Sequence, residues 1–178
     1  MEFKNEIAGA MPTDKDMLKY VDSELDIQPE RTNGAEKISL HNTTFKAETP
    51  FKVWYFELED GSNAHLHFKN KAKKPFKLVD LTISDSTLYL SSDVDIDMEE
   101  VSGYKSLDII VCGNSTAHID LRNFDLDSVY LCLNNLSESA KVRIFVKDGT
   151  KLWVNTKGRV GAYQLRIDGL PKMEVTSM

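Results

Sequence analysis

The segment SLDIIVCGNSTAHIDL, residues 106–121, alternates apolar and polar side chains, pauses at Gly-Asn-Ser-Thr and then resumes the alternation. A period of two with β-branched residues in the apolar positions indicates half-buried β-strands. Leu107, Ile109 and Val111 share one face of the first predicted strand, and Asp108 lies on the other. The segment therefore predicts two strands joined by a turn.

The same pattern returns along most of the chain. The first inward residues of successive units, Val79, Leu107, Val129 and Leu152, are separated by 28, 22 and 23 positions, and a looser unit begins at Val53. Spacings of this size are typical of solenoids, in which one coil cannot bury its inward face without a neighbour. We therefore predict an all-β fold, a short β-solenoid or β-helix whose coils each have two longer strands and one short strand.

An antiparallel β-sandwich or jelly roll is the alternative, because it uses the same strands with GNST, NNLSES and TKGRVG as hairpin loops. The segments VDIDM, residues 94–98, and NFDLDS, residues 123–128, continue the alternation where a hairpin array needs only a turn. They favour the solenoid, in which they form the short third strands.

The N-terminal segment differs from the repeats. In TDKDMLKYVDSEL, residues 13–25, Thr13 suits a helix N-cap, and Met17, Val21 and Leu25 fall on one helical face. Turn-forming residues follow before residue 35. We predict an N-terminal segment with a short helix over residues 1–35 and a β-rich domain of stacked repeats over residues 36–178.

The unit LDIIVCGNSTAHIDL resembles the repeats of the head GIN domain family of putative adhesins. Gly113, Ile119 and Leu121 match the family's pattern of a Gly-containing polar break between two alternating strands, and the resemblance covers residues 76–146. It implies a right-handed β-helix that serves as an adhesin-like binding scaffold without catalysis.

Composition excludes several classes of protein. The formal net charge of −6 argues against a nucleic-acid partner, which needs clustered Lys and Arg. No apolar run approaches the length of a membrane span, and the first residues lack the pattern of a signal peptide. We expect a cytoplasmic or virion-associated protein with no membrane partner, in which Cys112 and Cys132 are free thiols.

No catalytic, metal or cofactor motif is recognisable. Asp93, Asp95 and Asp97 fall on one side of an extended segment, where we expect a solvated acidic face more than a cation site. His65 and His67 share one side of a strand, but two ligands do not make a metal site. We therefore expect no enzyme activity, no cofactor and no metal.

Apolar side chains also occupy outward positions. If the coils stack in register, Tyr130 lies beside Trp153, flanked by Ile110 and Cys132, and Phe145 is also outward. Exposed apolar patches usually mark contacts, so we predict interaction residues at these positions and in the acidic segment, namely Tyr130, Trp153, Ile110, Phe145, Asp93, Asp95 and Asp97.

These observations predict a non-catalytic binding or structural protein, phage- or surface-associated, that binds protein and forms a homo-oligomer. Residues 80–127 hold 11 acidic residues against two basic ones. The first alternative is accordingly an inhibitor that binds a host protein through this acidic band, and the second is a carbohydrate-active enzyme on a β-helix.

Overall fold

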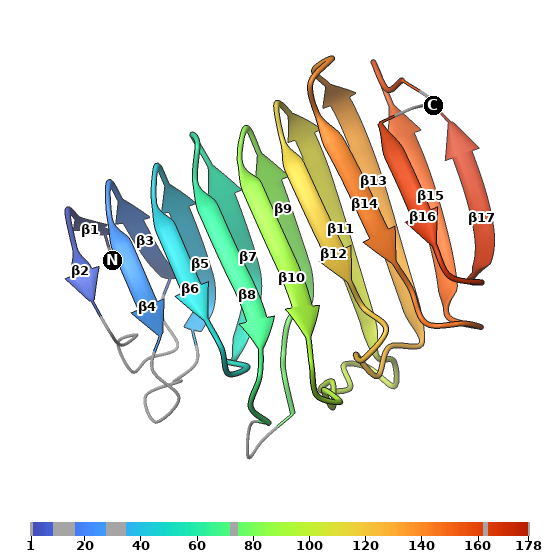
Figure 1. Ribbon diagram of the computed structural model, residues 1–178, viewed down its shortest axis with the longest axis horizontal. Coiled ribbons are helices and arrows are strands. Elements are labelled where there is room, and N and C mark those ends of the chain that lie inside the picture. Colours follow the sequence, from blue (N-terminus) through green and yellow to red (C-terminus); the bar gives the residue numbers. More distant parts are fainter. Residues whose placement is uncertain (1, 9–16, 28–34, 72–74, 162–163, 178) are drawn as a thin grey trace.

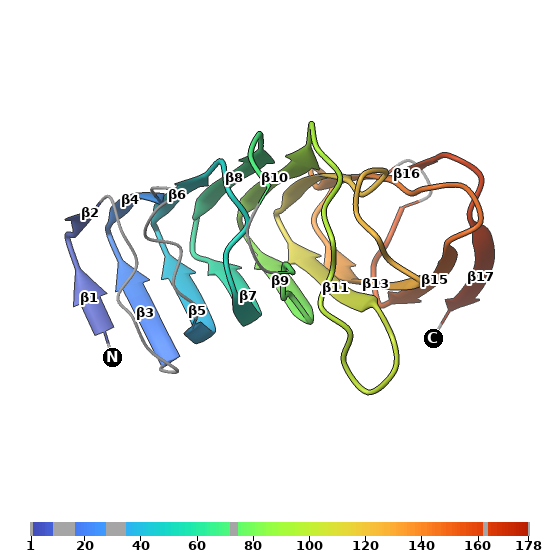
Figure 2. The ribbon, with the colours of Figure 1, turned by 90° about the horizontal axis from the view of Figure 1, so that it is seen from below.

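A computed structural model describes residues 2–8, 17–27, 35–71, 75–161 and 164–177. Within them every regular element is a β-strand and no helix is present. Two parallel sheets face each other along the length of the molecule, and successive strands alternate between them (Figure 1). Figure 2 shows the sheet of odd-numbered strands, hereafter sheet A, along the lower side. The sheet of even-numbered strands, hereafter sheet B, runs along the upper side, and the first and last coils lie at opposite ends. The chain is therefore a β-solenoid.

Sheet A has nine strands and sheet B has eight. Sheet A contains, in order, β1 (Glu2–Lys4), β3 (Met17–Val21), β5 (Ala35–His41), β7 (Val53–Glu59), β9 (Asp80–Ser84), β11 (Ser106–Gly113), β13 (Ser128–Leu136), β15 (Lys151–Lys157) and β17 (Lys172–Ser177). Sheet B contains, in order, β2 (Ile7–Ala8), β4 (Glu24–Ile27), β6 (Thr44–Ala47), β8 (Asn63–Phe68), β10 (Thr87–Ser92), β12 (Thr116–Asp120), β14 (Lys141–Phe145) and β16 (Leu165–Asp168).

The strand register confirms the spacing read from the sequence. Leu107 pairs with Val129, and Val129 pairs with Leu152, all in parallel. A hairpin sandwich requires antiparallel ladders, and every ladder between the named strands is parallel. The sandwich alternative is therefore wrong.

The predicted third strands are reduced to single parallel bridges. Phe76 pairs with Met98, and Ile96 pairs with Phe124. These four side chains are buried, so the alternation at residues 94–98 and 123–128 does report inward positions. In the described segments 93–105 and 121–127, this third side contains no strand longer than a single bridge.

The predicted N-terminal helix is wrong. Residues 17–21 and 24–27 form β3 and β4, which pair with β5 and β6 and so continue both sheets. Leu18 and Tyr20 are buried with a period of two, whereas Met17 is 58% exposed. The parallel ladder offered by β5 outweighs the local helical pattern, because packing routinely overrides propensity. Thr13, the proposed cap, lies outside the described residues.

Inward side chains form one continuous core. Ile109, Leu131 and Ile144 are at most 1% exposed, as the alternation predicts. Phenylalanine rings from neighbouring coils contact one another toward the irregular side, for example Phe51 and Phe76 with their centroids 6.0 Å apart. Each coil thus covers the apolar face of the next.

A row of buried hydroxyl groups runs through the turns that follow five successive sheet A strands, from β3 to β11. Its members are Ser23, Thr43, Ser62, Ser86 and Ser115. Each hydroxyl accepts a hydrogen bond from the backbone N–H of the residue one coil earlier; the Ser62 N–H, for example, lies 3.2 Å from Ser86 Oγ. Each also donates to a carbonyl of its own turn. The hydroxyl row therefore satisfies backbone groups that water cannot reach.

In each of these turns, a residue one or two positions before the hydroxyl residue has a positive φ angle. Asp22, Asn42 and Asp85 have φ values of 50°, 45° and 47°. Asn and Asp tolerate this left-handed conformation better than other non-glycine residues. Pairs of Asn or Asp with Ser or Thr therefore mark the turns at which the chain crosses between the sheets.

Candidate functional site

The outer face of sheet A carries a row of aromatic and charged side chains, hereafter row A. Strand pairing places its members side by side, in the order Lys37, Tyr55, Asp80, Asp108, Tyr130, Trp153 and Glu174. Row A thus runs from a cation through aromatic and acidic groups to an acid at the C-terminal end.

The Tyr130 and Trp153 rings stack within row A, as the sequence pattern predicts. Their centroids are 4.5 Å apart and their planes differ by 6°. The indole Nε1–H of Trp153 donates to Glu174 Oε2 at 2.8 Å, which fixes the ring across the next strand. On the adjacent outward row Ile110 pairs with Cys132, so the stack is bordered by further apolar surface. Both cysteines are free.

Two carboxylates of row A stand beside this apolar surface. Asp80 pairs with Asp108 on the neighbouring strand. Burial raises the pKa of both carboxyl groups, and the Asp80 charge raises the pKa of Asp108 further. Ionisation of Asp108 is therefore less favourable on this face than in free solution.

The other predicted interaction residues lie elsewhere. Phe145 belongs to β14 in sheet B, away from the Tyr130 and Trp153 stack. Asp93, Asp95 and Asp97 are all exposed in the segment after β10. Asp93 Oδ2 lies 3.0 Å from His67 Nε2, and Asp97 Oδ1 lies 3.1 Å from Lys105 Nζ.

The outer face of sheet B carries a second row, hereafter row B. Strand pairing places its members side by side, in the order Lys46, His65, Tyr89, His118, Arg143 and Arg166. The Tyr89 ring lies between the imidazoles of His65 and His118, at centroid distances of 5.7 and 5.2 Å. No acidic residue interrupts row B from β6 to β16.

A pocket of about 280 Å³ opens beside row B between β10, β12 and β14. Its lining includes Tyr89, His118, Arg122, Arg143 and Phe145. The Arg122 guanidinium lies over the Phe145 ring at 3.8 Å. Cationic and aromatic groups therefore converge in one hollow, which is the usual setting of a ligand site.

Carboxylates hold these guanidinium groups in place. Arg122 donates to both oxygens of Asp120, and Arg143 Nε donates to Asp168 Oδ2 at 2.9 Å. Burial acts to raise the pKa of Asp120, but the hydrogen bonds from Arg122 outweigh it and lower the pKa. The hydrogen bond from Arg143 holds the pKa of Asp168 below its usual value. Both acids thus remain ionised partners at neutral pH.

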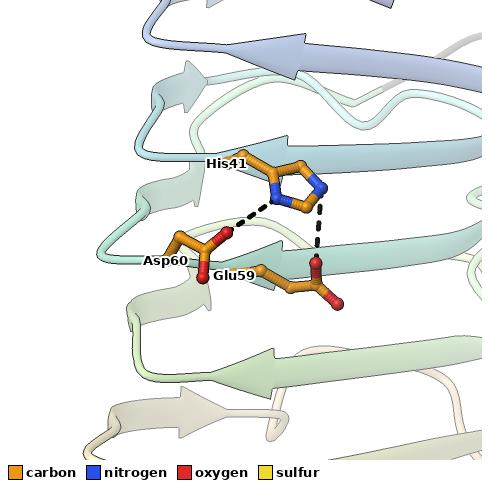
Figure 3. A group of neighbouring side chains, drawn as sticks. All are labelled: His41, Glu59 and Asp60. Atoms are coloured by element: carbon orange, nitrogen blue, oxygen red, sulfur yellow. Dashed lines mark hydrogen bonds and ion pairs between the residues drawn. The ribbon is translucent and has the colours of Figure 1, made fainter.

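A third cluster lies at the ends of β5 and β7, where His41 stands between two carboxylates (Figure 3). Nδ1 lies 3.0 Å from Asp60 Oδ2, and Nε2 lies 3.3 Å from Glu59 Oε2. A neutral imidazole has one N–H, so only the imidazolium can donate to both acids. One ring nitrogen and one oxygen from each carboxylate lie within 4.8 Å of one another, so these three residues have the spacing of potential metal ligands. The two contacts of the imidazole also link β5 to the coil of β7.

Phe145 was predicted as an interaction residue, but the other residues of row B and its pocket were not recognised as a site in the sequence. A usable signal exists, because each row B residue from Lys46 to His118 lies three positions after a residue of the hydroxyl row. Thr43 precedes Lys46, Ser86 precedes Tyr89, and Ser115 precedes His118 at this distance. Aligning the chain on its Asn/Asp-Ser/Thr pairs would have brought the row together.

Comparison with known proteins finds no relative. No family model matches the chain, no curated protein matches it, and no solved structure matches it. The resemblance to head GIN domain repeats stays a prediction. In the part of the chain that the structure describes, no helix is long and apolar enough to cross a membrane.

Proposed function

We propose that this chain is a non-catalytic β-solenoid scaffold that forms a homodimer through the outer face of sheet A. The observation that carries the proposal is the Tyr130 and Trp153 stack, which stands on a flat parallel sheet beside Ile110. Tyr130 is 44% exposed. Tyr and Trp are enriched among the residues that dominate interface energies.

The side chains of row A are complementary to the same row in a second copy of the protein that runs in the opposite direction. A two-fold axis lying along β11 in the plane of the interface places Lys37 opposite Glu174 of the second copy. The same axis places Tyr55 opposite Trp153, and Asp80 opposite the Tyr130 hydroxyl. The axis along β11 places one acid of row A, Asp108, opposite its own copy. A two-fold axis along the solenoid does so for Asp80, Asp108 and Glu174, so the first arrangement is favoured.

The axis along β11 also sets the size of the interface. It lets the strands of sheet A from β5 to β17 face their copies and leaves β1 and β3 uncovered. At a spacing of about 4.8 Å, with about three outward positions in each strand, the overlap gives roughly 550 Å² per copy. A standard protein interface buries about 800 Å² per partner, so this dimer is expected to be weaker than a standard complex.

Sedimentation velocity of the wild-type protein tests the proposal. We expect a dimer at micromolar concentration, and a monomer with an unchanged β-type circular dichroism spectrum when Trp153→Asp is combined with Tyr130→Ser. Tyr89→Ser removes an aromatic ring of similar exposure from sheet B and serves as the matched control, which should remain dimeric. A wild-type monomer at high concentration would overturn the proposal.

Charge reversal tests the orientation of the two copies. Lys37→Glu or Glu174→Lys alone should weaken the dimer, because each change creates a like-charge contact across the interface. The two changes together should restore much of the affinity. Failure of the double variant to recover would exclude the two-fold arrangement along β11.

A further inference from the structure

The pocket on sheet B and the adjoining end of row B contain unused hydrogen-bonding capacity of one chemical kind. Arg143 lines the pocket, and Arg166 lies next to it on β16, outside the lining. Each bonds to Asp168 through Nε. Within the described residues, the terminal nitrogens of these two guanidinium groups make no hydrogen bond. A free pair of terminal N–H groups matches the two oxygens of a carboxylate, sulfate or phosphate. The pocket is therefore prepared for an anionic group.

The neighbouring outward row supplies uncharged hydrogen-bonding groups. Thr44, Asn63, Thr87 and Thr116 pair side by side, and Lys141 follows them. These outward side chains, which are distinct from the buried hydroxyl row, form a line parallel to row B over the same strands. A ligand lying along the solenoid axis meets cationic groups on one side and neutral polar groups on the other.

The acids beside the pocket distinguish among anionic chains. Asp120 and Asp168 fix the arginines, and their remaining lone pairs accept hydrogen bonds from ligand hydroxyls. These two carboxylates and the overall charge of −6 repel a nucleic acid, which carries a phosphate on every nucleotide. A sugar chain with hydroxyl groups between its carboxylates suits both the acids and the arginines.

The aromatic groups of the pocket complete the match. Phe145 and Tyr89 line the pocket with outward aromatic rings, whereas Leu90 and Ile119 of the lining have their side chains in the core. The two rings provide apolar contact area for the C–H face of a sugar ring. The volume of about 280 Å³ is just below the usual range of small-molecule sites and suits a single ring.

We propose that row B and its pocket bind an acidic polysaccharide, with one carboxylate-bearing sugar seated between Arg143, Arg122 and Tyr89. The chain then continues along row B toward Lys46. This site lies on the face opposite the dimer surface, so both can be occupied in one molecule.

Calorimetric titration with hyaluronate oligosaccharides tests the proposal, with dextran as the neutral sugar and single-stranded DNA as the competing polyanion. We expect hyaluronate to bind, dextran to bind at least tenfold more weakly, and DNA to bind more weakly than hyaluronate. Affinity should fall as salt is raised. Absence of hyaluronate binding, equal binding of dextran, or tighter binding of DNA overturns the proposal.

Variants locate the site. Arg143→Gln should weaken hyaluronate binding at least tenfold. Arg143→Lys should give an intermediate loss, because lysine keeps the positive charge but lacks the paired N–H donors of the guanidinium group. Lys151→Gln removes a charge from sheet A and should leave the affinity unchanged. Unchanged binding by a folded Arg143→Gln protein would contradict the assignment. The Trp153→Asp and Tyr130→Ser variant should still bind hyaluronate, so failure of the dimer proposal and failure of this one are distinguishable.

Discussion

The backbone of Gly113 lies directly against the side chain of Asp85 in the turn one coil earlier. Gly113 has a φ of +66°, and Asp85 Oδ1 accepts a hydrogen bond from the N–H of Asn114 at 2.8 Å. A methyl group on Gly113 would overlap the Asp85 carboxylate. Gly158 has the same relationship to Asn135. Glycine at these turns thus makes room for the Asn or Asp of the preceding coil.

Gly113→Ala is expected to destabilise the protein, because alanine at positive φ costs about 1 kcal/mol and its methyl group displaces Asp85. Chemical denaturation measures the loss. Asp85→Gly in the same chain should recover part of it, since the carboxylate is then absent and glycine accepts the positive φ of position 85. Additive effects of the two changes would show that the two residues do not compete for this space.

The hydroxyl row gives a second prediction. Ser86→Ala removes the Oγ acceptor of the buried Ser62 N–H, which then keeps only the Glu59 carbonyl oxygen at 3.2 Å, and this should cost about 1 kcal/mol of unfolding free energy. Ser106→Ala is the matched control, because Ser106 is half-exposed and its hydroxyl has no hydrogen bond within the described residues. Equal, small losses in urea denaturation would mean that the row contributes nothing to stability.

Much of this fold could be predicted from alternation and spacing. The period of two placed Ile109 and Leu131 inward, and the repeat spacing paired Leu107 with Val129. Stacking of Tyr130 on Trp153 then followed from register alone. These features depend on patterns that repeat in every coil, so one correct alignment fixes many contacts.

The errors arose where local patterns were short. Residues 17–25 satisfy a helical spacing and a strand spacing at once, and only the ladder offered by β5 decides between them. The pocket beside row B combines Arg122, at the end of one coil, with Arg143 and Phe145 of the next. No local spacing reports such a contact, because it depends on the position of each turn in the stack.

The Asp80 and Asp108 pair gives the last prediction, on pH dependence. Burial and the neighbouring acid raise the pKa of Asp108 above its ordinary value of 3.8 in the folded protein. A raised carboxyl pKa contributes stability below the unfolded value, and this contribution is lost as the pH rises through the folded value. Asp108→Asn, which cannot ionise, should therefore be more stable than wild type at pH 7 and equal to it near pH 3.

The size of this gain is limited because Asp108 is exposed. Solvent screening restricts it to about 0.5 kcal/mol or less at pH 7, measurable as a small rise in melting temperature in dilute protein. In an Asp80→Asn background the gain should shrink, since the neighbouring charge that raises the pKa is then absent. A gain that is the same at pH 3 and pH 7 would show that ionisation of Asp108 is not its cause. Because the proposed dimer brings two copies of Asp108 together, the wild-type dimer should also tighten as the pH falls toward the raised pKa of Asp108, and Asp108→Asn should reduce that dependence.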